Sequence, residues 1–267
     1  MLITAPAPLG GGAPRMRKRL RNPRPSTPRP ENRRPARFSQ ILSVLYEDDA
    51  VVALDKPAGL MAVPIHGSAS PSALSLLSAK LTRKRQRALV VHRIDRFTSG
   101  ILLFAKTEPD REALVRQFLA HTPVRQYLAV VRGRLEGKEE TLVHHLRRVG
   151  MIQKLRTETD AAAARAELRY SVERPLAGAT LVRVTLVTGL QNQIRAQFAA
   201  IGHPVVGDRK YHAAESAEPL IARVALHAQH LEFLHPRAQE KIAIDCPPPR
   251  DFEHLVRALS PPARQRQ

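Results

Sequence analysis

Short apolar runs separated by polar segments dominate the central part of the chain. Residues 50–54 and 101–105 are continuously apolar, which predicts two short buried strands. In residues 181–188, valine and leucine alternate with arginine and threonine, as expected for a strand with one polar face. Further strands are predicted at residues 126–131, 166–172 and 225–233.

Two other segments place apolar residues at helical spacing. Residues 107–110 (Thr-Glu-Pro-Asp) resemble a capping box, and the apolar residues after them predict a helix. A second helix is predicted at residues 191–201, and Gly202 and Pro204 end it. We expect its buried face to contain Ile194, Phe198 and Ile201, and an opposite, unburied face to contain Gln191, Asn192 and Arg195.

Strands that follow one another with few crossover helices indicate an α+β fold. We expect a mostly antiparallel or mixed central sheet flanked by helices, in one domain spanning residues 39–259. Residues 1–38 are rich in proline and arginine, which predicts a disordered basic extension. This extension is either an arm that binds phosphates or an unconstrained terminus. Residues 260–267 are predicted to be a flexible tail.

The chain is strongly basic, with a formal net charge of +19 and an isoelectric point of about 11.2. Residues 1–38 contain ten Lys or Arg and one Glu, a net charge of +9, which leaves +10 for the rest. Both parts are therefore expected to attract polyanions, of which nucleic acid is the commonest.

Several other classes of protein are excluded. The chain has no apolar run of about 18 residues, so a membrane span is excluded, and its start does not resemble a secretory signal. Cys246 is the single cysteine, which excludes an intrachain disulfide and a thiolate metal cluster. His144 and His145 are adjacent and would point to opposite sides of a strand, so no metal site is expected. A cytoplasmic location fits this composition.

A polar loop at residues 92–100 (HRIDRFTSG) is the first candidate for chemistry. Asp95 is flanked by cationic residues, which favour its ionised form, and an ionised aspartate can act as a nucleophile or a base. The alternative is a structural aspartate, paired with Arg96 and bonded to turn amides beside Thr98 and Ser99.

Two more segments contain candidate residues. Tyr127, in residues 125–133, could stack on a nucleic-acid base or transfer a proton, or it is simply a half-buried sheet tyrosine. Arg195, in residues 188–195, could bind a carboxylate through two hydrogen bonds. The alternative for this segment is a polar stripe that faces solvent.

Together these segments resemble the motifs of RluA-type pseudouridine synthases. Residues 92–100 are similar to the HRLD-x-x-TSG signature, with Ile94 in place of leucine. The other similar segments occur in the family's order. They are residues 55–60 (DKPAGL), 125–133 (RQYLAVVRG), 188–195 (TGLQNQIR), 202–208 (GHPVVGD) and 223–236 (RVALHAQHLEFLHP).

The resemblance implies an enzyme that isomerises uridine to pseudouridine in structured RNA (23S rRNA, tRNA or both) and needs no cofactor or metal. It implies that Asp95 is the catalytic aspartate, that Tyr127 packs on the target base, and that Arg195 pairs with Asp95. Arg93 corresponds to the arginine that enters the RNA stack in place of the uridine. The other substrate-binding residues implied are His92, Arg96, Thr98, Gln193 and Ile194.

The sequence also departs from the family pattern. Leu190 replaces a usual arginine, whose phosphate contact Arg183 or Arg209 could supply, and Phe97 replaces a common acidic residue. No S4-type RNA-binding module is expected before Ser39, and a monomer is expected. The rival interpretation is a non-catalytic RNA-binding or ribosome-assembly factor on the same fold, although such a protein has no chemical need for Asp95, Tyr127 and Arg195 together.

Overall fold

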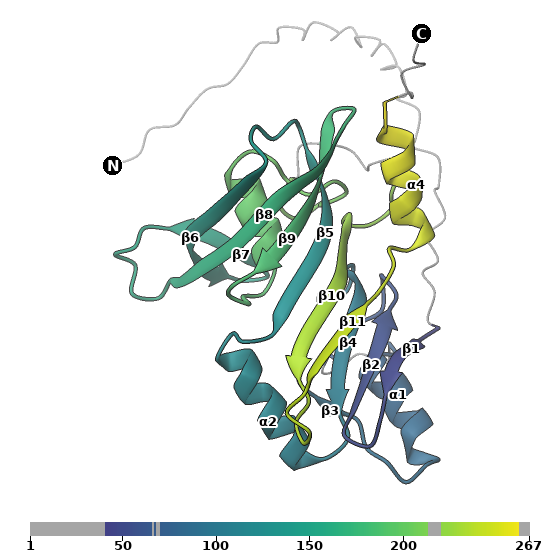
Figure 1. The fold of residues 1–267 in the computed structure, drawn as a ribbon. Helices are drawn as coiled ribbons and strands as arrows, with labels where there is room; N and C mark the ends of the chain where they lie inside the picture. Colours follow the sequence, from purple (N-terminus) through teal and green to yellow (C-terminus); the bar gives the residue numbers. More distant parts are fainter. Residues whose placement is uncertain (1–40, 66, 68–69, 213–219, 262–267) are drawn as a thin grey trace, which may run out of the picture. The chain divides into compact units, whose positions relative to one another are not determined.

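The computed structural model describes residues 41–65, 67, 70–212 and 220–261 (Figure 1). The predicted basic extension at residues 1–38 and most of the predicted tail lie outside the described residues. The strands are β1 (Ser43–Glu47), β2 (Val51–Lys56), β3 (Leu89–Val90), β4 (Ser99–Ala105), β5 (Val124–Arg132), β6 (Glu139–Val149), β7 (Ile152–Arg156), β8 (Ala164–Leu176), β9 (Ala179–Leu186), β10 (Leu226–Leu234) and β11 (Lys241–Asp245). The helices are α1 (Ala73–Thr82), α2 (Glu108–Leu119), α3 (Gln193–Ala200) and α4 (Arg250–Leu259).

All the strands belong to one sheet, in the order β1-β2-β4-β10-β5-β9-β8-β6-β7, with β11 beside β10 and β3 beside β4. The pairings are antiparallel except that β4 and β10 run parallel. This mixed sheet confirms the predicted α+β fold. None of the helices in the described residues is long and apolar enough to cross a membrane.

The parallel contact between β4 and β10 depends on a glycine. Gly100 has a φ of 107° and pairs with Ala228, and a Cβ at Gly100 would overlap the Ala228 backbone. Beside it, Ser99 and His227 form a buried hydrogen bond of 2.9 Å between Oγ and Nδ1. Because Gly100 has no side chain to separate the two backbones, β4 lies directly against β10 at the point where the polar loop ends.

The continuous apolar runs of β2 and β4 are explained by cover on both faces. Val52 and Phe104 pack with α1 on one face, while Val51 and Leu103 pack with Leu114 of α2 on the other. Helix α2 begins after Thr107, whose hydroxyl accepts from the Asp110 amide, as the capping pattern predicts.

The predicted burial of the second helix was wrong on its polar face. Helix α3 begins at Gln193, because Asn192 has a left-handed φ of 57°, and its polar residues are buried as well as its apolar ones. Gln197 shows why: its amide donates to the carbonyl oxygens of Leu142 and Ala166. The polar side of α3 is therefore satisfied by protein groups rather than by solvent.

Candidate active site

Asp95 lies in the loop between β3 and β4, and a buried lysine holds this loop. Lys56, at the end of β2, donates through Nζ to the carbonyl oxygens of Pro57, Leu60 and Arg96 at 2.9, 2.9 and 3.2 Å. These three acceptors match the three protons of an ammonium group. Burial, with a smaller effect of Arg223, lowers the pKa of Lys56 to about 7. Sequence reasoning assigned no role to Lys56, although its motif precedes the loop.

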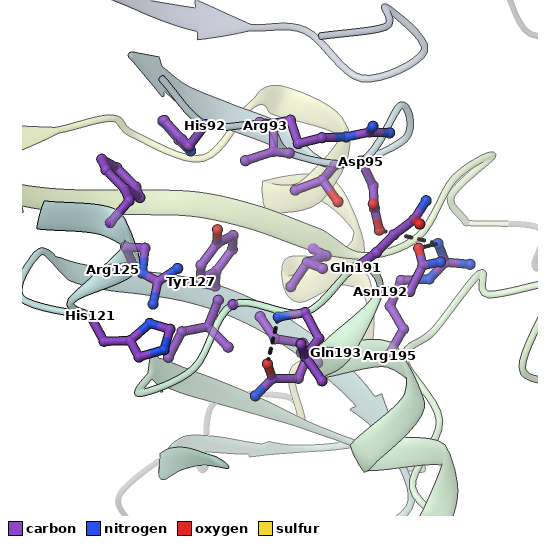
Figure 2. A pocket seen from close by; sticks show the side chains of 18 of the residues that line it. His92, Arg93, Asp95, His121, Arg125, Tyr127, Gln191, Asn192, Gln193 and Arg195 are labelled. Atoms are coloured by element: carbon purple, nitrogen blue, oxygen red, sulfur yellow. Dashed lines mark hydrogen bonds and ion pairs between the residues drawn. The ribbon is translucent and has the colours of Figure 1, made fainter. Parts of the chain in front are cut away.

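Asp95, Arg195 and Asp208 form a chain of charges (Figure 2 shows the first two). Nη1 of Arg195 lies 3.3 Å from Oδ2 of Asp95 and 2.8 Å from Oδ1 of Asn192. On its other edge, Nε and Nη2 of Arg195 donate to the two carboxylate oxygens of Asp208 at 2.6 and 2.8 Å. The expected pairing of Arg195 with a carboxylate is therefore present, and its bidentate partner is Asp208.

The charge of Arg195 is stabilised in a buried position. Burial opposes the charge, but hydrogen bonds and attraction from Asp208, and less strongly from Asp95, raise the pKa of Arg195. Oδ1 of Asp208 also accepts from the amides of Lys210 and Tyr211, and the Tyr211 ring lies 5.3 Å from the guanidinium carbon. Sequence reasoning missed Asp208. The Gly-Asp pair that ends residues 202–208 was the available signal.

A cavity of about 370 Å³ brings the three predicted catalytic residues together. Its walls include Asp95, Tyr127 and Arg195 (Figure 2). Ile194 also lines it and contributes an apolar surface. Burial and the negative charge of Asp95 raise the pKa of Tyr127 to about 12, against a lowering by Arg125. The phenol is thus protonated at neutral pH and can donate a hydrogen bond.

Most of the predicted substrate-binding residues also line this cavity. They are His92, Arg93, Thr98, Gln193 and Ile194. Arg96 instead lines a neighbouring cavity of about 500 Å³, which shares the wall formed by Arg93, Asp95 and Arg195. Nε of Arg96 donates to the Gly59 carbonyl at 2.9 Å, and its guanidinium lies 5.3 Å from the Phe97 ring centre.

Two of these residues use their polar atoms within the protein. The Gln193 amide accepts from Thr188 and the Leu190 backbone and donates to Glu167 and Gln197. Nε2 of His92 accepts from the Leu103 amide at 3.0 Å, so the ring is bound in its neutral form. The polar atoms of Gln193 and Nε2 of His92 are therefore not available to a substrate.

Thr98 differs from these two residues. Its backbone amide donates to the Asp95 carbonyl at 3.1 Å, while its side-chain hydroxyl is buried and has no hydrogen-bond partner among the described residues. A buried hydroxyl without a partner is costly, which suits a group that acquires its partner when a ligand enters.

The departure at Leu190 has a structural consequence. Leu190 packs against the cluster of Leu146, Ala166 and Ala196, so it adds an apolar contact where the motif has a cation. Arg183 is bound by Glu173 and Gln229 and lines neither cavity beside Asp95, whereas Arg209 lines the second one. Of the two suggested replacements, only Arg209 lies near the site.

His144 and His145 are neighbours in β6. They pair with Ala166 and Arg165 in β8, and Nδ1 of His144 lies 3.2 Å from the Gln197 amide nitrogen. Across residues 41–65, 67, 70–212 and 220–261, no group of three His, Cys, Asp or Glu side chains could hold a metal ion.

Comparison with known proteins agrees with this geometry. A protein family described as RNA pseudouridylate synthase matches residues 50–200, more than half of the chain. The chain belongs to this family. The resemblance to RluA-type pseudouridine synthases in the sequence motifs is thereby confirmed, and the protein is an RNA pseudouridine synthase, an isomerase.

Curated relatives of this pseudouridine synthase are named for the ribosomal large subunit. The chain is 32% identical to ribosomal large subunit pseudouridine synthase D of Zymomonas mobilis, over 87% of this chain and 76% of the relative. It is 38% identical to the protein of the same name from Xanthomonas campestris, over 82% and 69% of the two chains.

Solved structures support the fold. Human RNA pseudouridylate synthase domain containing 4 has a TM-score of 0.68 at 20% identity, over 81% of this chain and 92% of that one. Human RNA pseudouridylate synthase domain containing 1 has a TM-score of 0.64 at 24% identity, over 79% and 84%.

Proposed function

We propose that this pseudouridine synthase modifies specific uridines of 23S rRNA, tRNA or both, and that Asp95 acts as the nucleophile on a uridine flipped out of the RNA. The single observation that carries this proposal is the 3.3 Å contact between Asp95 and Arg195 in the wall of a cavity that also contains Tyr127. The names of the curated relatives favour large-subunit rRNA as the first substrate to test.

The reaction moves the glycosidic bond of uridine from N1 to C5 of the base. It needs an ionised carboxylate that is held close to both the ribose and the base. The guanidinium of Arg195 lies 3.3 Å from Oδ2 of Asp95 and can hold this carboxylate in place through a charge-assisted hydrogen bond. Three routes are open to Asp95: it can attack the anomeric carbon, add to C6 of the uracil, or assist formation of a glycal.

The base must leave its stack to reach this cavity, which costs a few kcal/mol of stacking energy. Arg93 is exposed and lies on the wall shared by the two cavities, so its planar cation can occupy the position that the uridine leaves. In the cavity, the Tyr127 ring and Ile194 supply the apolar surface for the uracil, and the free hydroxyl of Thr98 can bond to it.

The RNA backbone is expected to follow the second cavity. Arg93, Arg96, Arg209 and Lys210 contribute cations there, close to Asp95. Cations arranged beside a nucleophile attract phosphates without choosing a sequence. We propose that residues 39–259 are the catalytic domain and that residues 1–38 add further phosphate contacts. The cytoplasmic location and the monomeric state stay predictions.

The test is to map pseudouridine in RNA treated with the purified protein. Deproteinised 23S rRNA and unmodified tRNA are incubated with the enzyme at low salt, and pseudouridine is located by chemical modification and primer extension. New stops at discrete positions are expected. RNA binding without any new modified position would favour the rival interpretation, a non-catalytic RNA-binding or ribosome-assembly factor.

A further inference from the structure

Arg125 is a buried cation that lacks a carboxylate partner. Of the arginines that the structure describes, three are largely buried: Arg125 is 9% exposed, Arg195 6% and Arg223 2%. Arg195 and Arg223 are each bound by an aspartate through two hydrogen bonds. In the part of the chain that the structure describes, no carboxylate binds Arg125. Its Nε has no hydrogen-bond partner, and Nη2 makes one long contact of 3.4 Å to the Val187 carbonyl.

A buried guanidinium without a carboxylate partner lowers the stability of the folded protein. A buried charge must be compensated by an opposite charge or by hydrogen bonds, and Arg125 has little of either. Burial accordingly lowers the pKa of Arg125. Its guanidinium carbon lies 5.9 Å from the Phe118 ring centre, which is a weak substitute for an anion. A buried cation kept in a reactive cavity despite this cost points to a ligand.

The guanidinium of Arg125 is directed at the cavity that contains Asp95. Arg125 and Tyr127 are two residues apart in β5, so their side chains share one face of the strand, and both line this cavity (Figure 2). Gly189 faces the guanidinium, and a Cβ there would lie 2.5 Å from Nη1 of Arg125. The absence of a side chain at Gly189 therefore leaves room for the guanidinium.

We propose that Arg125 is a catalytic residue that donates hydrogen bonds to a carbonyl oxygen of the flipped uracil and stabilises the negative charge that the ring acquires during the reaction. This inference rests on the proposed function. If Asp95 attacks the anomeric carbon, the bond from N1 to C1′ breaks and its electron pair leaves with the uracil. If a glycal forms, Asp95 takes the C2′ proton, the pair of that C–H bond forms the double bond between C1′ and C2′, and the N1–C1′ pair leaves with the uracil.

Addition of Asp95 to C6 of the uracil, the third route, also places negative charge on the ring. The π electron pair of the double bond between C5 and C6 then moves toward C4, and the O4 oxygen takes up the negative charge. On every route the ring oxygens of uracil therefore carry negative charge that is absent from the bound substrate. A cation without a carboxylate partner suits this task, because a partner would neutralise the charge offered to the ring.

The test compares the Arg125→Met variant with wild type in single turnover on the RNA that wild type modifies. One RNA carries uridine at the target and a second carries 5-fluorouridine, whose electron-withdrawing fluorine makes the ring a better leaving group. We expect the rate of glycosidic bond cleavage in Arg125→Met to fall by roughly 100-fold on uridine. The loss should be several-fold smaller on 5-fluorouridine, while RNA affinity and melting temperature stay close to wild type.

Two further variants keep the inference testable if methionine disturbs the fold. Arg125→Lys keeps the charge and should keep most of the activity. Gly189→Ala leaves Arg125 in the chain but places a methyl group against its guanidinium, and it should show the same dependence on the leaving group as Arg125→Met. An equal loss on both RNAs, or no loss, would overturn the inference while the proposed function stands. A wild-type protein that modifies no RNA would defeat both.

Discussion

Arg195 is held more tightly by Asp208 than by Asp95: its hydrogen bonds to Asp208 are 2.6 and 2.8 Å long, and its contact with Asp95 is 3.3 Å. Among the described residues, Oδ1 of Asp95 accepts no hydrogen bond, and 20% of the Asp95 side chain is exposed. Asp208 therefore fixes the guanidinium, and Asp95 keeps an oxygen available for reaction.

The first prediction concerns the Asp208→Asn variant. An amide cannot accept both hydrogen bonds from Arg195, so the buried guanidinium loses its compensating charge. We expect the free energy of unfolding to fall by about 3–5 kcal/mol. The single-turnover rate of the folded protein should fall by roughly 100-fold, because Arg195 and Asp95 are no longer held in position. Thermal unfolding and single-turnover assays measure the two effects.

Asp251→Asn is the matched control. Asp251 binds Arg223 through the same two-bond geometry, but 45% of its side chain is exposed and it lines neither cavity. This variant should lose stability without losing the rate of the folded enzyme. If both variants lost rate to the same extent, the positioning role of Asp208 would be wrong.

The second prediction concerns Asp95→Asn. The substitution hardly changes the volume of the side chain, so the fold and the RNA affinity should be retained. The amide is not a nucleophile, so turnover should fall by roughly three orders of magnitude or more. Pseudouridine mapping measures turnover, and filter binding measures affinity. Substantial residual turnover would mean that another residue is the nucleophile.

The fold was predictable where local patterns and burial agree. The apolar runs at residues 50–54 and 101–105 became β2 and β4, and the capping pattern at Thr107 became the start of α2. Helix α1 was missed because its start depends on a reciprocal pair of Ser72 and Ser75, without an acidic residue in the first turn. Strand β7 and the extent of β6 beyond His144 and His145 were missed because both strands are largely polar and exposed; β6 is held by pairing with β8, and β7 by pairing with β6.

The site was predictable only in part, because some of its contacts join side chains from separate segments of the chain. The sequence motifs named Asp95, Tyr127 and Arg195, and the structure brings them to one cavity. The burial of Arg195 could not be predicted from its helix, because its compensating partner Asp208 follows in a separate loop. The sequence also could not show that Arg125 lacks a carboxylate partner, because this depends on the side chains that several neighbouring elements place around it.

The third prediction concerns the acid stability of the loop that carries Asp95. Burial and the nearby charge of Arg125 lower the pKa of His92 to about 3. Between pH 6.5 and 3 the unfolded chain therefore binds a proton that the folded chain does not, so stability falls as the pH falls through this range. The His92→Gln variant, which keeps an acceptor for the Leu103 amide, lacks this proton.

The measurement is urea unfolding of wild type and His92→Gln at several pH values from 7.5 to 4. Wild type should lose stability relative to the variant below pH 6.5, by up to about 1.4 kcal/mol per pH unit. The two proteins should show parallel behaviour above pH 7. Parallel curves throughout would show that His92 is protonated in the folded state.

The fourth prediction concerns Arg93 and base flipping. If its guanidinium replaces the uridine in the stack, Arg93→Ala should lower product formation mostly on folded RNA, because an unstructured substrate needs no replacement. Single-turnover rates on a folded rRNA fragment and on a short unstructured oligonucleotide containing the same target measure this difference. Equal losses on both substrates would count against the role.

The fifth prediction concerns residues 1–38, whose ten cations and single anion make them the most basic part of the chain. A cation that binds a phosphate releases a counterion, so removing one such cation lowers the slope of log affinity against log salt by about 0.7–0.9. Deleting residues 1–38 should therefore weaken RNA binding at low salt and flatten its salt dependence, without lowering the single-turnover rate at saturating enzyme.

A full-length variant with the ten cations replaced by glutamine separates charge from length. Because counterion release depends on charge alone, this variant should match the deletion, and an unchanged slope in both would show that the extension does not contact RNA.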